Sequence, residues 1–465
     1  MRPAAQRRAG HRRRPRRRRG PPRLPARPHS SPKATDVLTS RDSGAKTPPA
    51  AEAPPSLWRH RDFLLYWFGQ TVSRGGTQVA ELVLPLAAIY LFEASAGQLG
   101  VINAIAFAPY LLVTLLAGVW IDRSTKRGIL AVAELGRIVA LGSVAALTLA
   151  DGLELYHLYL VAAVMGVCAV LFDVSGTAYL PSLIERDQLL DGNSRLQGSI
   201  VVTQAGGPAL GGVLVHLASA PAILAASVIS PIASLAALFG IRHRERPPER
   251  PERRDTFAEI GESLRFIARD RYLRFLVVRS GVNNLFFMAR TTILPLFVLD
   301  VLGMSSALLG LVLAAGAVGA LTGAALAKRT ALRLGPGRVI AFGYGGASLV
   351  QIVLPLTMGP TPLALAMLLT MFFVSGTLMT IGNTNVATFQ QMVIPRRKIG
   401  RVVAGMRTVT WGAMPLGALL GGWLGSTVGI RETLFVTATG FCLSALWIAL
   451  SPIAKLRTMP EPPED

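Results

Sequence analysis

Long runs of apolar residues, separated by short polar linkers, dominate the chain from Phe63 onward. Each run is about 18 to 25 residues long, which is the length at which a helix crosses a hydrocarbon core about 30 Å thick. A soluble core would instead show short amphipathic periods. The pattern therefore predicts an all-α polytopic membrane protein.

About twelve such segments can be delimited, and most of the linkers between them are short. They cover residues 63–92, 97–119, 128–150, 155–178, 194–218, 221–241, 275–299, 305–327, 338–358, 361–386, 400–428 and 432–453.

One long linker, residues 242–274, separates the sixth and seventh segments. It opens with RHRERPPERPERRD and continues as TFAEIGESLRFIARDRYLRF, whose amphipathic pattern predicts a helix lying along the membrane surface. The chain is thus expected to contain two six-helix bundles, over residues 57–241 and 275–456, followed by a short tail over residues 457–465.

The two predicted bundles repeat each other at an offset of about 210 residues. Residues 99–100 (LG) align with residues 309–310 (LG), and GPALGG at 207–212 aligns with GALLGG at 417–422. Six spans repeated in the same direction predict two parallel halves with a pseudo-two-fold axis along the membrane normal. Such halves commonly rock around a central site.

Composition agrees with a membrane protein, because 51% of the residues are hydrophobic and only 16% are charged, against about 25% in soluble proteins. More than half of the net charge of +22 lies in the first 61 residues. The Arg- and Pro-rich tail over residues 1–56 cannot bury enough apolar surface to fold and is expected to be disordered.

Three interpretations of this tail stay open. It is held at anionic lipid, it is an over-extended gene start with no role, or it binds nucleic acid. Because no aromatic residues are interleaved with the arginines, a nucleic-acid partner is not expected.

Basic residues gather in the loops after even-numbered segments, and the loops on the other side carry little beyond Arg431. By the positive-inside rule both termini are expected in the cytoplasm. The basic loop residues are Arg123, Lys126, Arg127, those of the long linker, Lys328, Arg329, Arg333, Arg338, Arg396, Arg397, Lys398 and Arg401.

The residues offer no chemistry typical of an enzyme. The two cysteines, Cys168 and Cys442, lie inside apolar segments, and the six histidines are scattered without metal-ligand spacing. No phosphate-binding Gly-Lys-Ser/Thr loop and no nucleophile elbow is present, which also argues against ATP-driven export. We therefore expect no cofactor and no metal.

The loop after the second segment, GVWIDRSTKR, resembles the G-x-x-x-D-R-x-G-R-R motif of the major facilitator superfamily. Thr125 replaces the usual glycine and Lys126 the usual arginine, while the Asp-Arg core is kept. The motif residues are Gly118, Asp122, Arg123, Lys126 and Arg127. The resemblance covers residues 57–456 and implies a secondary transporter.

Two further resemblances refine this expectation. The stretch QAGGPALGGVL resembles the motif in the fifth helix of the superfamily's antiporters, through Gly207, Pro208, Gly211 and Gly212. The segments YLPSLIERDQLLDGNS and VIPRRKIGRVVAGMR are similar to a bacterial branch that includes macrolide-efflux proteins and the enterobactin exporter. The glycine stretch is either a hinge and seal against leak or simple close packing.

Charges inside spans are costly, so each needs a reason. Arg74 and Glu81 are seven residues apart on one face of the first segment, and Arg290 lies one residue from the repeat equivalent of Glu81. Since the first helix of each half lines the cavity in the superfamily, we expect Glu81 and Arg290 to face each other and couple transport to protons. The alternative is a static ion pair between Glu81 and Arg74.

Asp173 lies late in the fourth segment. By resemblance it accepts Arg123 in a cytoplasmic latch with Asp122 at the start of the eleventh helix, whose dipole favours an anion there; a proton carrier is the alternative. Glu134 and Arg137, three residues apart, are expected to form a local pair supporting that latch.

Amide and aromatic side chains on a wide apolar cavity suit loose recognition of bulky compounds. The candidates for lining it are Gln78, Asn103, Asn283, Asn284, Phe287, Asn383, Gln390 and Trp411. The resulting hypothesis is a monomeric proton antiporter in the bacterial cytoplasmic membrane that exports a lipophilic drug or secondary metabolite. A siderophore exporter, an uptake carrier for a small solute and a non-transporting sensor are the alternatives.

Overall fold

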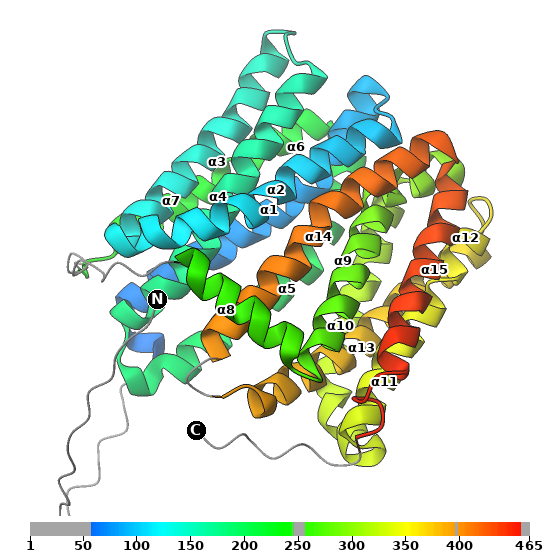
Figure 1. Ribbon diagram of the computed structural model, residues 1–465. Helices are drawn as coiled ribbons and strands as arrows, with labels where there is room; N and C mark the ends of the chain where they lie inside the picture. The colour runs from blue at the N-terminus through cyan, green and yellow to red at the C-terminus, as the bar shows by residue number, and fades with distance from the viewer. Residues whose placement is uncertain (1–56, 244, 246–255, 396–398, 457–465) are drawn as a thin grey trace, which may run out of the picture. The chain divides into compact units, whose positions relative to one another are not determined.

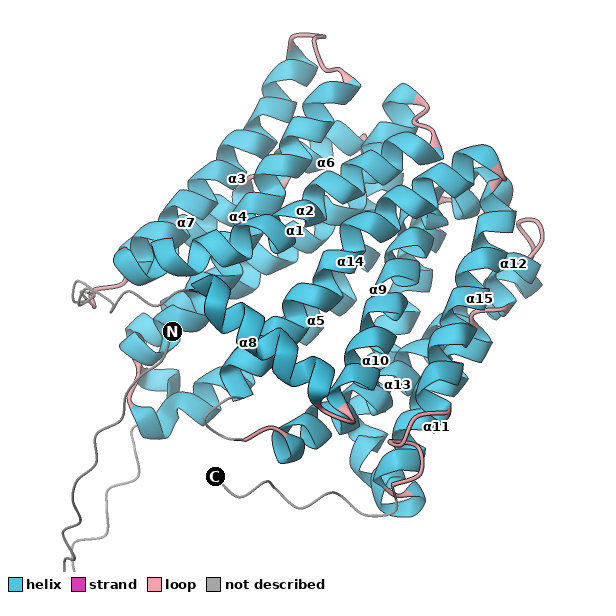
Figure 2. Ribbon diagram, viewed as in Figure 1, coloured by secondary structure: helices cyan, strands magenta, loops and turns pink. Residues whose placement is uncertain are grey.

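The computed structural model describes residues 57–243, 245, 256–395 and 399–456 (Figure 1). These residues form helices and the turns that connect them, and no strand occurs among them (Figure 2). The predicted tails over residues 1–56 and 457–465 lie outside the described residues.

The N-terminal half contains seven α-helices and two short 3₁₀ turns. They are η1 (Leu57–Arg59), α1 (Arg61–Phe92), α2 (Ala96–Arg123), α3 (Lys126–Leu149), α4 (Leu155–Leu183), η2 (Arg186–Gln188), α5 (Leu189–Leu217), α6 (Ala220–Ala226) and α7 (Ile229–Gly240).

The linker helix and the C-terminal half follow. They are α8 (Thr256–Arg269), α9 (Leu273–Leu296), the π-helical turn η3 (Phe297–Val301), α10 (Ser306–Leu334), α11 (Pro336–Val350), α12 (Val353–Leu356), α13 (Pro362–Val393), α14 (Ile399–Thr427) and α15 (Ile430–Ala449).

Each predicted apolar segment coincides with helical structure. Ten spans in the described part of the chain are long and apolar enough to cross a membrane, and α2 and α14 occupy the predicted second and eleventh segments. The sixth and ninth segments are each interrupted, between α6 and α7 and between α11 and α12.

The predicted amphipathic linker helix is present as α8. It packs against α14 and α9, and its Ile267 is buried in the same apolar cluster as Val402 and Met406 of α14. Part of its apolar face is therefore covered by the C-terminal half, a contact that the amphipathic pattern alone did not specify.

The helix contacts follow the sequence repeat. In the N-terminal half α1 packs on α5 and α7, and α4 packs on α2 and α3. In the C-terminal half α9 packs on α14 and α15, and α13 packs on α10 and α11. Each helix thus has a counterpart with the same neighbours, as expected for two parallel six-helix repeats.

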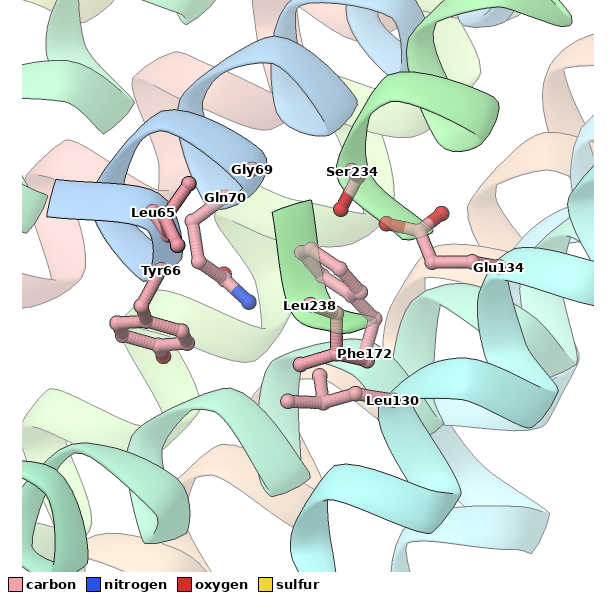
Figure 3. Close-up of a pocket in the computed structure, with 9 residues that line it drawn as sticks. All are labelled: Leu65, Tyr66, Gly69, Gln70, Leu130, Glu134, Phe172, Ser234 and Leu238. Carbon is pink, nitrogen blue, oxygen red and sulfur yellow. The ribbon is translucent and has the colours of Figure 1, made fainter. Parts of the chain in front are cut away.

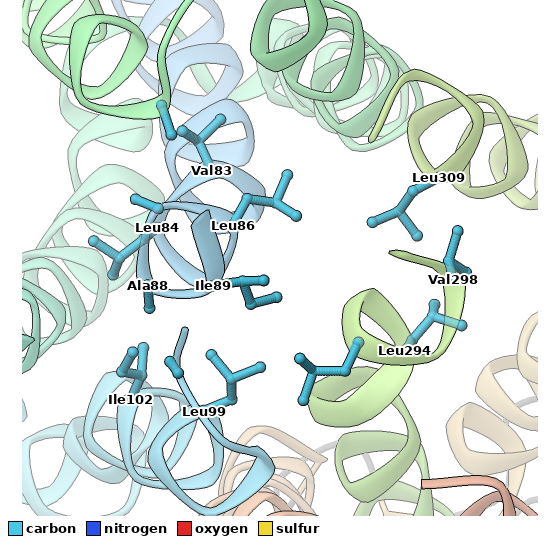
Figure 4. Packing of buried hydrophobic residues seen from close by; sticks show 14 of the residues in the cluster. Val83, Leu84, Leu86, Ala88, Ile89, Leu99, Ile102, Leu294, Val298 and Leu309 are labelled. Carbon is cyan, nitrogen blue, oxygen red and sulfur yellow. The ribbon is translucent and has the colours of Figure 1, made fainter. Parts of the chain in front are cut away.

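The hydrophobic core joins the two halves toward one end, where a large shared cluster is followed by a small one of Ala104, Met288 and Ala418. At the end where α1 finishes and α2 begins, a single cluster combines Leu86 and Leu99 with Leu294 and Leu309 of the other half (Figure 4). At the opposite end the cores are separate, one around Phe63 and the other within the C-terminal half. By the predicted orientation, the joined end is the external one.

Two pairs of glycines lie in this joint. Gly100 of α2 meets Gly422 of α14, and Gly310 of α10 meets Gly212 of α5. A Cβ on Gly212 would lie 2.5 Å from Ser306 O and 2.7 Å from Gly310 Cα. The repeat relates the two pairs, because Gly310 and Gly422 lie 210 residues after Gly100 and Gly212.

The rest of the antiporter-like glycine stretch packs within the N-terminal half. A Cβ on Gly207 would collide with Gln78, and one on Gly211 would lie 3.3 Å from Leu82 Cδ2, so α5 approaches α1 closely along this stripe. Pro208 lies inside α5 without ending it, and its carbonyl contacts Gly310. The predicted close packing is confirmed, while the role of the stretch as a hinge stays a prediction.

Substituting Gly212 with alanine is expected to destabilise the protein, because the new methyl group meets backbone atoms of α10 that cannot rotate away. Overpacking of this kind costs about 1–3 kcal/mol. Thermal unfolding can be followed with a thiol-reactive dye, since Cys168 is buried and becomes accessible on unfolding.

Gly206→Ala is the matched control. Gly206 lies on the same helix, and a Cβ there meets nothing within 4 Å. An unfolding midpoint that is the same for the two variants would contradict the assignment of Gly212 to a tight contact between the halves.

Candidate functional site

A charged cluster lies where α1, α2 and α4 meet within the N-terminal half. Arg74 Nη2 of α1 lies 2.8 Å from Asp173 Oδ1 of α4. Tyr110 of α2 donates its hydroxyl hydrogen to Asp173 Oδ2 at 3.0 Å. Both carboxylate oxygens are thus satisfied, and the Arg74 and Asp173 side chains stay 25% and 34% exposed.

This cluster touches the other half of the molecule. The ring of Tyr110 lies 4.9 Å from the ring of Trp411 on α14, centroid to centroid, and 6.0 Å from that of Phe107 on its own helix. The Arg407 guanidinium lies 5.9 Å from the Trp411 ring. One aromatic contact therefore separates the Arg74–Asp173 pair from the C-terminal half.

Glu81 is exposed and lies outside that pair. Its Oε2 accepts a hydrogen bond from Gln78 Nε2 at 2.7 Å, one turn earlier on α1. Among the described residues no ion pair joins Glu81 to an arginine, so the predicted static pair with Arg74 is wrong. Arg74 instead pairs with Asp173 of α4. The spacing of residues along α1 gives no information about a partner on another helix.

Arg290 does not face Glu81, which corrects a second expectation. It is 7% exposed and donates from Nη1 to Gln351 Oε1 at 2.8 Å, inside the C-terminal half. Rings of Phe287, Phe372 and Phe441 surround it at 5.2 to 5.9 Å. The repeat equivalent of Glu81 is Thr291, and one residue turns a helical side chain by about 100°, from the outside to the inside.

The predicted latch between Asp173 and the loop motif is only partly described. Gly118, Asp122 and Arg123 belong to the stretch of α2 whose side chains lie outside the described residues. The latch therefore stays a prediction, and in the described part of the chain Asp173 is held by Arg74 and Tyr110.

The last two residues of the motif hold the start of the linker. Lys126 Nζ lies 3.5 Å from Glu245 Oε1, and the backbone N–H of Arg127 donates to Glu245 Oε2 at 3.2 Å. Arg127 also donates from Nη2 to the carbonyl of Phe239 at 3.3 Å. The end of α7 and the linker that leaves it are thus tied to the start of α3.

The predicted local pair of Glu134 and Arg137 is confirmed. Arg137 Nη1 lies 3.6 Å from Glu134 Oε2 and donates to Ser73 Oγ of α1 at 2.8 Å. Its guanidinium lies 4.4 Å from the centre of the Phe172 ring. The pair is more deeply buried than Arg74 and Asp173, with side-chain exposures of 4% and 1%.

Three of the predicted cavity residues pack inside the C-terminal half. Asn283 is 4% exposed and accepts a hydrogen bond from Arg279 Nη2 at 3.2 Å. Asn284 Nδ2 donates to the carbonyl of Thr410 at 2.9 Å, and Gln390 Nε2 lies 3.8 Å from Met406 Sδ. In this conformation the Asn283 amide bonds Arg279 of its own helix, and the amides of Asn284 and Gln390 contact α14.

The other candidates are partly or fully exposed. Gln78 bonds Glu81, and Asn103 donates to Leu99 O on its own helix at 3.2 Å. Asn383 accepts from the Tyr344 hydroxyl at 2.9 Å, while Phe287 is 39% exposed and Trp411 borders the N-terminal half. Their contact with substrate stays a prediction.

Sequence reasoning missed Tyr110 and Arg279. Arg279 is 3% exposed, stacks 3.2 Å from the centre of the Tyr344 ring, and forms no ion pair among the described residues. Its charge inside an apolar segment was a usable signal. No signal marked Tyr110, because its role depends on two side chains from other helices.

Solved transporters share this fold. A bacterial homologue of the iron transporter ferroportin, in an inward-facing state, matches with a TM-score of 0.68 at 19% identity, covering 84% of this chain and 98% of that one. A POT family transporter in complex with 5-aminolevulinic acid matches with a TM-score of 0.67 at 11% identity, covering 85% and 97%. The chain thus has the fold of a major facilitator transporter.

Sequence relatives narrow the family. The multidrug efflux pump Tap of Mycobacterium tuberculosis is 26% identical over 412 residues, which are 85% of this chain and 95% of the relative. Tap of Mycolicibacterium fortuitum is 25% identical over 382 residues, covering 80% and 90%. The family model described as transmembrane secretion effector matches residues 53–463, and the chain belongs to this family of the major facilitator superfamily. It is a multi-pass membrane transporter.

The Arg74–Asp173 pair is expected to show energetic coupling. In a double-mutant cycle with Arg74→Gln and Asp173→Asn, the second substitution is expected to cost less once the first is present. A coupling energy of about 0.5–3 kcal/mol is typical of side chains in one network. Thermal unfolding of the four proteins in detergent measures it.

The control cycle uses Arg195 and Asp191, an i,i+4 pair at 2.8 Å in which Asp191 is 52% exposed. Ion pairs at i,i+4 on one helix contribute about 0.3–0.5 kcal/mol. Strict additivity of Arg74→Gln and Asp173→Asn would contradict a stabilising pair.

Proposed function

We propose that this transporter exports a lipophilic or amphiphilic compound in exchange for protons, by alternating access. The name of the Tap relatives, multidrug efflux pump, supports export of drug-like compounds. The proposal of proton exchange rests on the excess of carboxylates over arginines inside the spans of the N-terminal half.

The interiors of the N-terminal spans hold three carboxylates and two arginines. Arg74 pairs with Asp173, and Arg137 pairs with Glu134. Glu81 is the carboxylate left over, and its described partner is the neutral amide of Gln78. A carboxylate inside a membrane span without a fixed cation is costly to keep charged, so a proton is its natural counter-ion.

The position of Glu81 suits coupling to substrate. The side chain is exposed, and the proposal requires that water reach it to deliver and remove its proton. Gln78, which bonds it, packs with its Cβ against Gly207 of the glycine stretch on α5. The protonation state of Glu81 thus acts at the α1–α5 contact, close to the joint between the halves.

The arrangement of the cores supports alternating access. The halves share a core at the predicted external end and have separate cores at the predicted cytoplasmic end. Rotating each half as a unit opens the joint at the glycine pairs and leaves both separate cores intact. In this conformation the external end is closed.

The surfaces on which a substrate would lie are aromatic and partly exposed. Tyr110 and Phe107 of α2 lie beside Trp411 of α14, and Phe287 of α9 is exposed. Aromatic rings with a few amides favour loose recognition of bulky apolar compounds. The membrane would be the bacterial cytoplasmic membrane, with both termini in the cytoplasm.

Proton movement in inside-out vesicles tests this proposal. An imposed pH gradient is read with a pH-sensitive dye while macrolides, cationic dyes and siderophores are added in turn. A transported compound is expected to dissipate the gradient with the intact protein, and Glu81→Gln is expected to reduce the response to that of vesicles without the protein.

Glu93→Gln is the matched control, because Glu93 is the exposed residue that ends the same helix. It should behave as the unmodified protein. Gradient dissipation that survives Glu81→Gln would show that another group carries the proton, and a panel without any response would contradict proton-coupled export.

A further inference from the structure

A small internal pocket lies within the N-terminal half, between α1, α3, α4 and α7 (Figure 3). About 10 Å³ of it is open to the centre of a water molecule, which is close to the minimum that one water needs. Its lining residues are Leu65, Tyr66, Gly69, Gln70, Leu130, Glu134, Phe172, Ser234 and Leu238.

The pocket contains a carboxylate that is poorly compensated. Glu134 is 1% exposed, and neither of its oxygens accepts a hydrogen bond from the described residues. Arg137 Nη1 lies 3.6 Å away and gives its short hydrogen bond, 2.8 Å, to Ser73 Oγ instead. Burying a charge is costly unless it is both paired and hydrogen-bonded, and Glu134 has the first without the second.

Polar groups suited to a water molecule surround this carboxylate. In Figure 3 the Glu134 carboxylate and the Ser234 hydroxyl lie close together, and the Gln70 amide enters the pocket from α1. A buried water is usually held by two to four such partners. One water here can hydrogen-bond Glu134 without any movement of the helices.

From this geometry we infer that Glu134 is a second proton-binding site of the transporter, which takes up a proton through one water held in the pocket. The inference rests on the proposed proton coupling and adds a second group to it. Uptake converts the carboxylate to the neutral acid, and the water that delivers the proton is replenished from solvent.

The charged and titratable groups around Glu134 decide what its proton does. Arg137 lies on the same helix, α1 contributes Arg74 and Tyr66, α4 contributes Cys168 and Asp173, and α7 contributes none. The guanidinium groups of Arg137 and Arg74 lie 4.4 and 5.6 Å from the centre of the same Phe172 ring.

Neutralising Glu134 leaves the charge of Arg137 uncompensated. Asp173, which follows Phe172 on α4, already holds Arg74. Arg137 then competes with Arg74 for Asp173, and Asp173 is the acceptor for Tyr110 at the contact with Trp411. The proton on Glu134 is thereby linked to the contact between the halves.

Three leucines separate the site from the end of the bundle. Leu65, Leu130 and Leu238 line the pocket about one helical turn beyond Gly69, Glu134 and Ser234, toward the predicted cytoplasmic end.

Infrared difference spectroscopy against pH, on purified protein in lipid vesicles, tests the inference. The carbonyl stretch of a protonated carboxyl group reports proton binding directly and requires no substrate. Because the chain has 26 Asp and Glu residues, the components of interest are those that disappear when each variant is compared with the unmodified protein. Glu134→Gln should remove one, Glu81→Gln should remove the other, and Glu134→Asp should keep its component at a shifted frequency.

A spectrum of Glu134→Gln that superimposes on that of the unmodified protein would show that Glu134 stays ionised as the fixed partner of Arg137, and would overturn the inference. Loss of the component in Glu134→Gln, with its return in Glu134→Asp, supports it. If the Glu81 component alone is absent, the assignment of Glu81 as the proton carrier fails while this site stands; proton-coupled export itself is tested separately by the vesicle experiment.

Should Glu134→Gln fail to fold, Glu134→Asp decides the matter by itself. A carboxyl component that does not shift between the unmodified protein and Glu134→Asp overturns the inference. A shift supports it.

Discussion

Close contact of glycine backbones at one end of the molecule is the constraint on which the rest depends. Gly100 against Gly422 and Gly212 against Gly310 let α2 approach α14 and α5 approach α10 with no side chain between them. Lipid offers no hydrophobic drive for helix association, so packing at such small residues supplies the attraction. Because the two pairs are related by the repeat, they form one joint with two-fold character, and the other end of each half is free to keep its own core.

The charged residues inside the spans also differ between the two halves. Carboxylates inside spans occur only in the N-terminal half, at Glu81, Glu134 and Asp173, whereas the acids of the C-terminal spans lie at their ends, at Asp300 and Glu432. The C-terminal half instead buries Arg279 and Arg290 against aromatic rings and amides. The proposed proton exchange therefore assigns its carboxylates to the N-terminal half, which contacts the C-terminal half at Trp411.

The sequence predicted the features that depend on period and repetition. Apolar segment lengths located the helices, and the offset of about 210 residues related Gly100 to Gly310 before any contact was known. It did not predict partners between helices. Arg74 and Glu81 share a face of α1, yet Arg74 pairs with Asp173 of α4, because α4 brings a carboxylate closer than the next turns of α1 do. Arg290 shows how sensitive such reasoning is, since an error of one residue in the repeat reverses the direction in which a side chain points.

The described contacts form a continuous path from the interior of one half to the surface of the other. Glu134 pairs with Arg137, Arg137 shares the Phe172 ring with Arg74, Arg74 holds Asp173, and Asp173 orients Tyr110 against Trp411. Such a path has physical meaning only if it contains an element with two arrangements. We assign that role to Asp173, because Arg74 holds it and Arg137 lies over the same Phe172 ring as Arg74. Under the proposed proton exchange, the carboxylate that holds a proton would decide which arginine Asp173 pairs with, and the change would reach α14 through Tyr110 and Trp411.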